Sequence, residues 1–556
     1  MILSALVNRY EETSDTPLGW QTREASYALE IANDGELLAI ISLGETKGNK
    51  PGKLSMKLPT AGKGRSGKKA YETAYFLCDN ADFMLGLDPK KFESAQKLHL
   101  SLLENCDSPN AVAIKAYFER GIQAPPKTDE SKVDSKSNYV FSHKGKRIDY
   151  DDESIRRAWD NASLISNNKK NEVLCLVTGK QDELIKLHYK IELRSVTMGK
   201  SPLISMNDQQ SFRSYGATTD DPPAYIGQYA AFAYSTALNE LLKNNCVYIG
   251  EDALLYWAEK NGKAEESLFA EFNSPPKSDE AVELEEIAKR LAKGEKINEV
   301  DFERKFYLLC LSPNVARISV RFFYENNFGV LINNVATHYN RLEIIGDGRT
   351  PFNLLPIWLI LKETTIKGEG KENPLLRGQL LRSVFANEKY PFTLYYAILA
   401  RIKAGDDITK TKAAVVKAVL IKNYKEQEVT TMALNELTSD KPYVLGRLFA
   451  VLENLQHRAN GASNIRERFF SSASTNPKLV FPNLLKLSMH HTAKLDSSVF
   501  FEKLKGELMG KLKLEDAPFP IMLNLEEQGK FILGYYHQRQ DLFQSKNKEE
   551  LKNEEV

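Results

Sequence analysis

Two patterns of apolar and polar residues open the chain. Residues 2–12, ILSALVNRYEE, carry apolar side chains at helical spacing and predict a helix. Residues 25–43 contain two runs of alternating apolar and polar positions, separated by Asn33, Asp34 and Gly35. These turn-forming residues between two alternating runs predict a β-hairpin. The chain is therefore expected to start with a helix followed by paired strands.

The middle of the chain mixes both periodicities. Residues 172–185 predict a strand that runs into a turn, and the alternation in 315–325 predicts a strand with Arg317, Ser319 and Arg321 on one face. Helical spacing predicts helices in three stretches: 74–121, 230–244 and the charged 275–300. Glycine, lysine and polar residues predict a loop over 44–70 and a connection over 124–137.

After residue 375 the pattern becomes uniformly helical, with short polar breaks and no alternation. The fold class predicted is an α+β N-terminal region of mixed short strands and helices, followed by an all-α helical bundle. We place the N-terminal domain at 1–365, a linker at 366–374 (IKGEGKENP) and the helical bundle at 375–556.

Length and composition narrow the class of protein. The 556 residues exceed what one hydrophobic core holds, and 42% apolar and 27% charged residues are ordinary for a globular protein. The five scattered cysteines favour neither a disulfide framework nor a structural zinc site, so we expect a reducing cytoplasm. The most apolar window, residues 352–365, is too short to span a bilayer. No membrane partner and no signal peptide are expected.

Positive charge is concentrated locally, because the formal net charge is only +1. Residues 62–69, GKGRSGKK, approach the spacing of a nucleotide-binding P-loop, but Lys69 stands where that motif needs a hydroxyl for Mg²⁺. Glycines let a backbone approach a polyanion closely, and lysine and arginine neutralise it. The pattern suits a nucleic-acid backbone better than a mononucleotide. A solvated loop without a ligand is the alternative.

Catalytic signatures are lacking. The adjacent His490 and His491 lie in a predicted helix, where neighbouring side chains point in different directions and make a poor metal pair. No H-E-x-x-H, G-x-S-x-G or clustered carboxylate pattern appears in the sequence. The sequence offers no argument for an enzyme, a catalytic residue, a metal or another cofactor.

Six stretches together resemble one family, the large subunit of the type I-C CRISPR Cascade surveillance complex. In chain order they are MILSALVNRYE, RSG…YFLCDNADFMLGL, LISMNDQQSFRSYG…AAFAYSTALNELL, LCLSPNVARISVRFFYENNFGVLINNVATHY, VLGRLFAVLENLQ and RFFSSASTNPKLVFPNLLKLSMHHTAKL. The resemblance covers nearly the whole chain, and the joint occurrence of the six stretches makes it specific.

The resemblance implies a non-enzymatic subunit that binds nucleic acid. Such a subunit reads the protospacer-adjacent motif in double-stranded target DNA, helps to open the duplex and stabilises the R-loop. The implied partners are the guide RNA (crRNA), the Cascade backbone subunits, the subunit that binds the crRNA handle, and a recruited helicase–nuclease. A small subunit from the same gene is also implied, with Met432 as its candidate internal start. The alternative for Met432 is an ordinary helix methionine.

Within this framework, the basic loop becomes the candidate contact with the flanking-motif duplex. Arginine and lysine bind phosphates and guanine edges, and asparagine suits adenine or minor-groove acceptors. The predicted DNA-binding residues are Lys63, Arg65, Ser66, Gly67, Lys68, Lys69 and Asn80. Helix capping is the alternative for Asn80, and the favoured role for the neighbouring Asp79.

A second group of arginines has matching family context but no spacing that decides its role. It comprises Arg194, Arg213, Arg317, Arg321, Arg466 and Arg468. The last two lie beside Phe469 and Phe470, and basic and aromatic residues together can bind single strands. A structural salt bridge is the alternative for the first four, and a snorkelling position at the edge of an aromatic core for the last two.

Two further function classes compete with this interpretation. A metal-dependent nuclease acting on RNA or DNA would need carboxylates or histidines that cluster only in space. A protein-only scaffold would bind neighbouring subunits and no nucleic acid. Metal-dependent cleavage by the purified chain would identify the first class. A lack of crosslinks between target DNA and this chain would identify the second.

Overall fold

The structure, a computed structural model, describes residues 1–45, 51–60, 73–165, 172–194, 201–205, 224–273, 300–315, 317–346, 355–370, 372–462, 464–495, 498–512 and 517–554. Its contacts divide the chain into two compact units. The first contains residues 1–244 with 314–318, and the second contains 245–313 with 319–556. We expected the division at 366–374, whereas these contacts divide the chain after Asn244.

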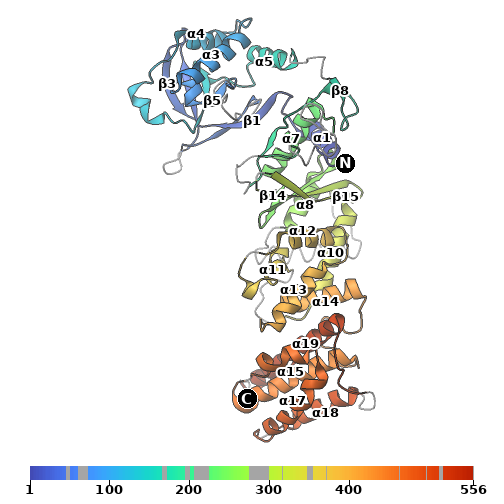
Figure 1. Ribbon diagram of the computed structural model, residues 1–556. Helices are drawn as coiled ribbons and strands as arrows, with labels where there is room; N and C mark the ends of the chain where they lie inside the picture. The colour runs from blue at the N-terminus through green and yellow to red at the C-terminus, as the bar shows by residue number, and fades with distance from the viewer. Residues whose placement is uncertain are drawn as a thin grey trace, which may run out of the picture. The chain divides into compact units, whose positions relative to one another are not determined.

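A five-stranded mixed sheet forms the centre of the first unit (Figure 1). Its strands lie in the order β3–β2–β6–β5, with the short β7 also paired to β6. The strands are β2 (Tyr27–Ile31), β3 (Leu37–Ser42), β5 (Cys78–Asn80), β6 (Asn138–His143) and β7 (Lys146–Arg147). The pairing of β2 with β6 is parallel and the other pairings are antiparallel. Helices α3 (Pro89–Leu102) and α4 (Pro109–Arg120) contribute to the same apolar core.

The predicted hairpin is confirmed as β2 and β3. Gly35 lies in its turn at φ 82°, a backbone conformation that side chains with a Cβ rarely adopt. A Cβ at this position would lie 2.2 Å from the backbone nitrogen of Tyr117 in α4. The turn therefore requires glycine for both its conformation and its close approach to the helix.

Two predictions for this unit were wrong in part. Residues 54–59 lie inside the predicted loop but form strand β4 (Leu54–Pro59), which pairs with β1 (Trp20–Ala25) in an antiparallel ribbon. Met56 and Leu58 are buried, so an alternating apolar pattern stabilises this strand within a stretch rich in glycine and lysine. Cys78–Asn80 is a strand rather than the helix expected there, because it pairs with β6 at the sheet edge.

The remaining elements of the first unit include the predicted N-terminal helix. They are α1 (Ile2–Thr13), α2 (Ala81–Met84), the 3-10 helix η2 (Lys127–Lys132), α5 (Glu153–Ile165), β8 (Glu172–Leu174), β9 (Gln181–Glu183), β10 (Lys190–Ile191), β11 (Ser201–Pro202) and α7 (Gln228–Asn244). Helix α1 packs against α7, where the Tyr10 ring meets Phe232 edge-on with centroids 5.7 Å apart. The strands predicted over 172–185 and the helix predicted over 230–244 are thereby confirmed.

The second unit starts with a four-stranded sheet, in the order β12–β13–β14–β15. The strands are β12 (Cys246–Ile249), β13 (Asp252–Ala258), β14 (Lys305–Asn314) and β15 (Arg317–Asn327). Strand β15 confirms the alternation seen in 315–325. The predicted helix at 275–300 falls almost entirely outside the described residues.

Helices then follow without further strands in the described part of the chain, which confirms the α+β start and helical end. They are α10 (Phe328–Leu342), α11 (Ile357–Lys362), η5 (Ile366–Gly368), α12 (Pro374–Phe385), α13 (Phe392–Lys403), α14 (Lys410–Val419), the π-helix η6 (Leu420–Tyr424), α15 (Lys441–Asn460), α16 (Ile465–Ala473), α17 (Pro477–Thr492), α18 (Val499–Lys511) and α19 (Leu525–Glu554). Two further helices, η4 (Glu259–Asn261) and α8 (Lys263–Asn273), lie earlier, between β13 and β14. One apolar core runs through this unit from β12 to α19.

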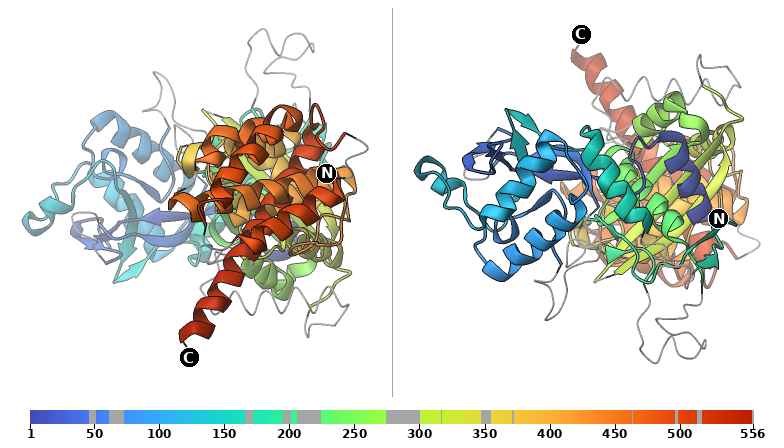
Figure 2. Two further views of the ribbon diagram at one scale, coloured as in Figure 1. Left: turned by 90° about the horizontal axis from the view of Figure 1, so that it is seen from below. Right: turned by 90° about the horizontal axis from the view of Figure 1, so that it is seen from above.

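Helices α15 and α19 form the most closely packed pair of the C-terminal bundle (Figure 1). A Cβ on Gly446 of α15 would lie 1.9 Å from the Phe531 carbonyl oxygen, and a Cβ on Gly534 of α19 would lie 2.0 Å from the Tyr443 carbonyl oxygen. Reciprocal glycines thus allow the two backbones to touch. The C-terminal end of α19 projects beyond the other helices of the bundle (Figure 2).

The stretch predicted as a linker connects helices that share this core. Ile360 of α11 and Leu380 of α12, on either side of residues 366–374, belong to the same apolar cluster. Glu372 also accepts a 2.7 Å hydrogen bond from Arg377. The segment therefore connects helices within one compact unit.

Candidate nucleic-acid interface

Two structured segments flank residues 61–72 in the sequence. On one side, β4 ends at Pro59 and the Thr60 N–H donates to the Gly19 carbonyl at 2.8 Å. On the other side, the buried Asp79 carboxylate accepts from the N–H groups of Tyr75 (2.9 Å) and Asn80 (2.8 Å). The six predicted contact residues Lys63, Arg65, Ser66, Gly67, Lys68 and Lys69 themselves lie outside the described residues.

A buried histidine fixes the segment that leads into β5. The Leu77 N–H donates to His99 Nε2 at 3.0 Å, and His99 Nδ1 lies 2.7 Å from the Ala95 carbonyl. This pairing requires a neutral ring with its proton on Nδ1. Burial lowers the pKa of His99 to about 4. Leu77 has a φ of 58°, so this contact holds a backbone conformation that is unfavourable for leucine.

The pKa of His99 predicts acid sensitivity. The unfolded chain binds a proton at this ring near pH 6.5, whereas the folded protein does so only near pH 4. Stability is therefore fully present above pH 6.5 and falls as the pH drops toward 4, by about 3 kcal/mol from this group. His338 and His537, whose pKa values burial lowers to about 3, add to the effect.

Urea denaturation between pH 7.5 and pH 4.5 measures this dependence. We expect His99→Gln to reduce the loss of unfolding free energy by up to about 1.4 kcal/mol per pH unit. The control His457→Gln changes an exposed histidine and should leave the pH dependence unaltered. Identical pH profiles for wild type and His99→Gln would contradict the buried neutral ring.

Asn80 acts as the N-cap of α2, since its Oδ1 accepts from the Asp82 N–H at 3.1 Å. The structure therefore shows the capping role for Asn80. Because Oδ1 is engaged in the cap, a contact between Asn80 and a base edge would have to use its amide nitrogen. Asp79 does not cap the helix, contrary to the favoured interpretation. It precedes the cap, and its carboxylate instead accepts from the backbone N–H groups of Tyr75 and Asn80.

A cluster of cations and aromatic rings lies at the β1–β4 ribbon. The Tyr150 ring meets the Trp20 ring edge-on, with centroids 5.0 Å apart. Lys57 Nζ lies 5.6 Å and Arg156 Cζ 4.9 Å from the centroid of Tyr150. Cation–π attraction to this ring favours these positions of Lys57, in β4, and Arg156, in α5.

Arg23 of β1 is a further cation, and it lies beside β5. Its Nη1 donates to the Cys78 carbonyl at 3.1 Å, and its guanidinium lies 5.4 Å from the centroid of Tyr75. Sequence reasoning did not identify Arg23, Lys57 and Arg156 as cations held beside Tyr75 and Tyr150. The alternation of Leu54, Met56 and Leu58 would have identified β4, but pairing with β1 cannot be derived from local pattern.

The second group of arginines is not brought together. Arg194, Arg317 and Arg468 are exposed, and Arg213 lies outside the described residues. Arg321 donates to the Ser312 hydroxyl at 2.9 Å and packs against Gly378 of α12. Arg466 pairs with Asp407 at 2.6 Å. Arg321 and Arg466 therefore have structural partners that occupy their guanidinium groups.

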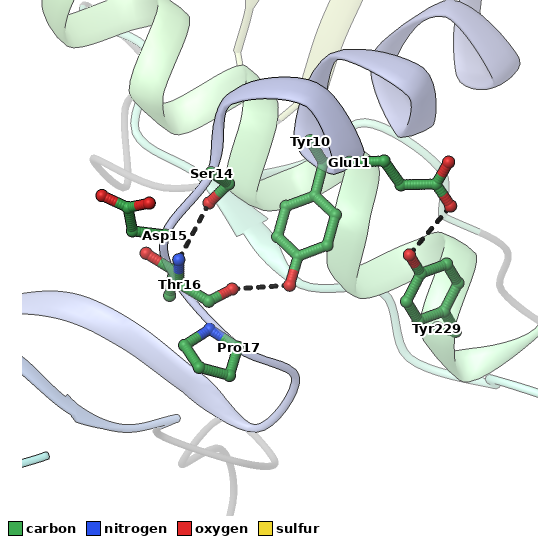
Figure 3. A pocket seen from close by; sticks show the side chains of 7 residues that line it. All are labelled: Tyr10, Glu11, Ser14, Asp15, Thr16, Pro17 and Tyr229. Atoms are coloured by element: carbon green, nitrogen blue, oxygen red, sulfur yellow. Dashed lines mark hydrogen bonds between the residues drawn. The ribbon is translucent and has the colours of Figure 1, made fainter.

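A hollow in the first unit does not suit a polyanion. It has a volume of about 390 Å³, and its lining residues are Tyr10, Glu11, Ser14, Asp15, Thr16, Pro17 and Tyr229 (Figure 3). The Tyr229 hydroxyl donates to the Glu11 carboxylate at 2.9 Å. Two carboxylates would repel phosphates at this position.

The described residues lack two other kinds of site. No three His, Cys, Asp or Glu side chains within the described ranges are placed to hold a metal ion. No described helix combines the length and apolar character needed to cross a membrane.

The family comparison covers nearly the entire chain. The model of the family described as CRISPR-associated protein (Cas_Csd1) matches residues 3–543. The chain belongs to the Cas_Csd1 family. Membership confirms the CRISPR association that the six sequence stretches implied. The match includes both compact units, so the sheet region and the helical bundle are parts of one Cas_Csd1 protein. No curated protein matched the chain.

Proposed function

We propose that this Cas_Csd1 protein is the non-catalytic large subunit of a type I-C Cascade complex. In this role it recognises the protospacer-adjacent motif in double-stranded DNA, assists duplex opening, stabilises the R-loop and helps to recruit the helicase–nuclease. Its partners are crRNA, the backbone subunits, the crRNA-handle-binding subunit and the small subunit. The observation that carries the proposal is the family match across residues 3–543.

Local charge supports a role in DNA binding. Residues 62–69 contain four lysines and arginines and no acid, although the whole chain is almost neutral. Among the described residues, Lys57 belongs to the strand that precedes this stretch and shares the Tyr150 ring with Arg156, and Arg23 contacts Tyr75, which follows the stretch in the sequence. Such a concentration of cations binds phosphates, while a glycine-rich backbone permits close approach to a groove.

Energetics supports a role for the subunit as a helper rather than a motor. In RNA-guided recognition, the RNA–DNA duplex formed is about as stable as the DNA duplex that it replaces. A few protein contacts can therefore favour opening without ATP hydrolysis. This fits a chain whose glycine-rich loop lacks the hydroxyl of a P-loop.

We also propose that Met432 is the start of a separately translated small subunit. Met432 lies between η6 and α15, so such a product would contain the α15–α19 bundle. Its side chain is about half exposed, which is uncommon for a methionine that only fills a core.

The double variant Arg65→Ala/Lys68→Ala tests the proposed duplex contact. Binding of the assembled complex to target DNA should weaken, and the slope of log affinity against log salt should flatten by about 1.8 for two lost phosphate contacts. If either residue also reads a base, the preference for the correct flanking motif should fall about tenfold. Filter binding or anisotropy with correct and scrambled motifs at several salt concentrations measures both effects.

A matched control removes the same charges elsewhere in the first unit. Lys97 and Arg157 are exposed and each pairs only with a carboxylate one helical turn away. Lys97→Ala/Arg157→Ala should leave DNA binding unchanged. Equal binding by wild type and the Arg65/Lys68 variant would exclude the loop from target recognition.

A further inference from the structure

An unusual helix ending lies in the second unit. Helix α14 continues into the π-helix η6 (Leu420–Tyr424), and Lys425 then adopts a left-handed conformation with φ 65°. Short π-helical segments are rare and frequently occur at functional sites. The core role of α14 does not require such an ending, because its buried residues precede it.

Cations from separate elements meet at this ending. Arg341 lies in the last turn of α10, and its Nη1 donates to the Asn387 side-chain oxygen at 3.1 Å. The Lys422 ammonium of η6 donates to the same oxygen and to the Asn387 carbonyl. Asn387 holds a left-handed φ of 52°, which asparagine tolerates better than most residues. Thus one asparagine positions two cations from distant parts of the chain.

This positive charge has no acidic partner among the described residues. No carboxylate there lies within 4.0 Å of Arg341, Lys422 or Lys425. Two acids nearby in the sequence are engaged by other cations: Glu388 pairs with Arg382 at 2.8 Å, and Glu426 pairs with Lys530. The carbonyl of the exposed Glu343 accepts from Lys417.

Electrostatics confirms that these cations affect one another. Partial burial, and then repulsion from Arg341 and Lys425, lower the pKa of Lys422. A further exposed cation, Lys389, lies two residues after Asn387. Like charges held together at a cost in stability are expected where an anion binds, because the bound anion relieves their repulsion.

Exposed aromatic side chains follow directly in the chain. Phe392 is 56% and Tyr396 59% exposed, one helical turn apart on α13. Two hydrogen bonds link the start of this helix to η6: the Tyr390 N–H donates to Asn423, and the Asn423 amide donates to the Tyr390 carbonyl, at 3.0 and 2.9 Å. These bonds join the element that carries Lys422 to the start of the helix that carries Phe392 and Tyr396.

We infer that these cations and rings of the second unit bind single-stranded nucleic acid. Arg341, Lys422, Lys425 and Lys389 contact its phosphates, while Phe392 and Tyr396 stack against its bases. The inference rests on the proposed function and extends it, since it places a strand-binding site on the second unit, apart from the basic loop of the first.

The chemistry favours a single strand over other anions. A duplex keeps its bases stacked inside and offers exposed aromatic rings no face to stack on. An isolated phosphate would require the cations but would leave two large exposed rings unexplained. Cations beside sequence-tolerant aromatic platforms are the combination that single-strand-binding surfaces use.

Charge reversal tests the phosphate contacts in the full-length chain. Lys389→Glu/Lys425→Glu changes exposed residues whose side chains make no bond to other described groups, so folding should persist. We expect the affinity for a fluorescent 20-nucleotide DNA strand of mixed sequence to fall at least tenfold. The salt slope should flatten by about 1.4 for two lost contacts. Fluorescence anisotropy at several salt concentrations measures both.

Removing the rings tests stacking separately. Phe392→Ala/Tyr396→Ala should weaken binding of the same strand about tenfold or more, with an unchanged salt slope. Matched controls are Phe500→Ala, which truncates an equally exposed (56%) phenylalanine on α18, and Lys486→Glu, which reverses an exposed lysine on α17. Both controls should bind within about twofold of wild type.

The outcomes distinguish this inference from the proposed function. Loss of strand binding by both double variants, with controls unchanged, supports it even if the protein proves not to recognise a flanking motif. Binding within twofold of wild type by either double variant overturns it, even if the Arg65/Lys68 variant loses duplex binding. Preferential loss of duplex rather than single-strand binding also overturns it.

Discussion

Replacing Gly446 by alanine should destabilise the C-terminal bundle by about 3 kcal/mol, because the helix pair has no space for the added methyl group. Its Cβ would lie 1.9 Å from the Phe531 carbonyl oxygen, which belongs to the rigid backbone of α19. Helices α15 and α19 would have to separate, and the apolar contacts along both would weaken. Chemical denaturation of the full-length chain gives the change in the free energy of unfolding.

A second glycine in the same bundle supplies a control of opposite sign. Gly506 lies within α18, and a Cβ there would meet nothing within 4 Å. Because glycine costs a helix about 1 kcal/mol relative to alanine, Gly506→Ala should stabilise slightly. If Gly446→Ala were also stabilising, the close contact between the two helix backbones would be wrong.

Replacing Arg377 by methionine should cost about 3–5 kcal/mol, the usual result of leaving one member of a buried ion pair alone. Arg377 is 4% exposed, and its Nη1 lies 3.2 Å from Asp252, which is 1% exposed. Its other terminal nitrogen binds Glu372. Although partial burial alone would raise the pKa of Glu372, hydrogen bonds from its own backbone and from Arg377 lower it.

Hydrogen exchange of peptides from β13 and α12 localises the effect of this substitution. The double variant Arg377→Met/Asp252→Asn should recover part of the lost protection, since the buried charge is then removed. Arg382→Met changes an exposed arginine of the same helix and should cost at most about 0.5 kcal/mol. Equal protection in wild type and Arg377→Met would show that the ion pair contributes nothing.

The sequence predicted the local elements that strong local signals specify. Asn33, Asp34 and Gly35 determine the β2–β3 turn, and helical spacing identified α1 and the helices after residue 375. Strand β4 was missed because flanking glycines and lysines dominate its surroundings. Strand β5 was missed because its three residues, Cys78, Asp79 and Asn80, are too few to show a period, and their partner β6 is distant in the sequence.

The division into compact units depends on contacts that no local pattern encodes. Residues 366–374 have the composition of a linker, with two glycines and four charged residues. Arg377 and the shared apolar core nevertheless connect the elements on both sides. Composition indicates how flexible a segment is by itself. A compact unit is defined by the apolar side chains that its helices and strands bury together.

For the candidate site, the sequence supplied the charges but not the structure that holds its flanking segments. The predicted roles of Lys63, Arg65, Ser66, Gly67, Lys68 and Lys69 stay predictions, since these residues lie outside the described ones. The sequence did not show that His99 and Asp79 hold the segment before β5, because they do so by accepting hydrogen bonds from backbone N–H groups. Such pairings arise only when the chain is folded.

The contact between Tyr395 and α19 has a consequence for any shorter product of the same gene. A Cβ at Gly529 of α19 would lie 2.1 Å from the Tyr395 hydroxyl oxygen. That hydroxyl donates to the Leu525 carbonyl at 2.7 Å. A polypeptide beginning at Met432 would lack this tyrosine, leaving a notch the width of a phenol ring on α19. The same surface of α19 would then be covered by Tyr395 in the long protein and exposed in the short one. Its sequence would have to suit both environments.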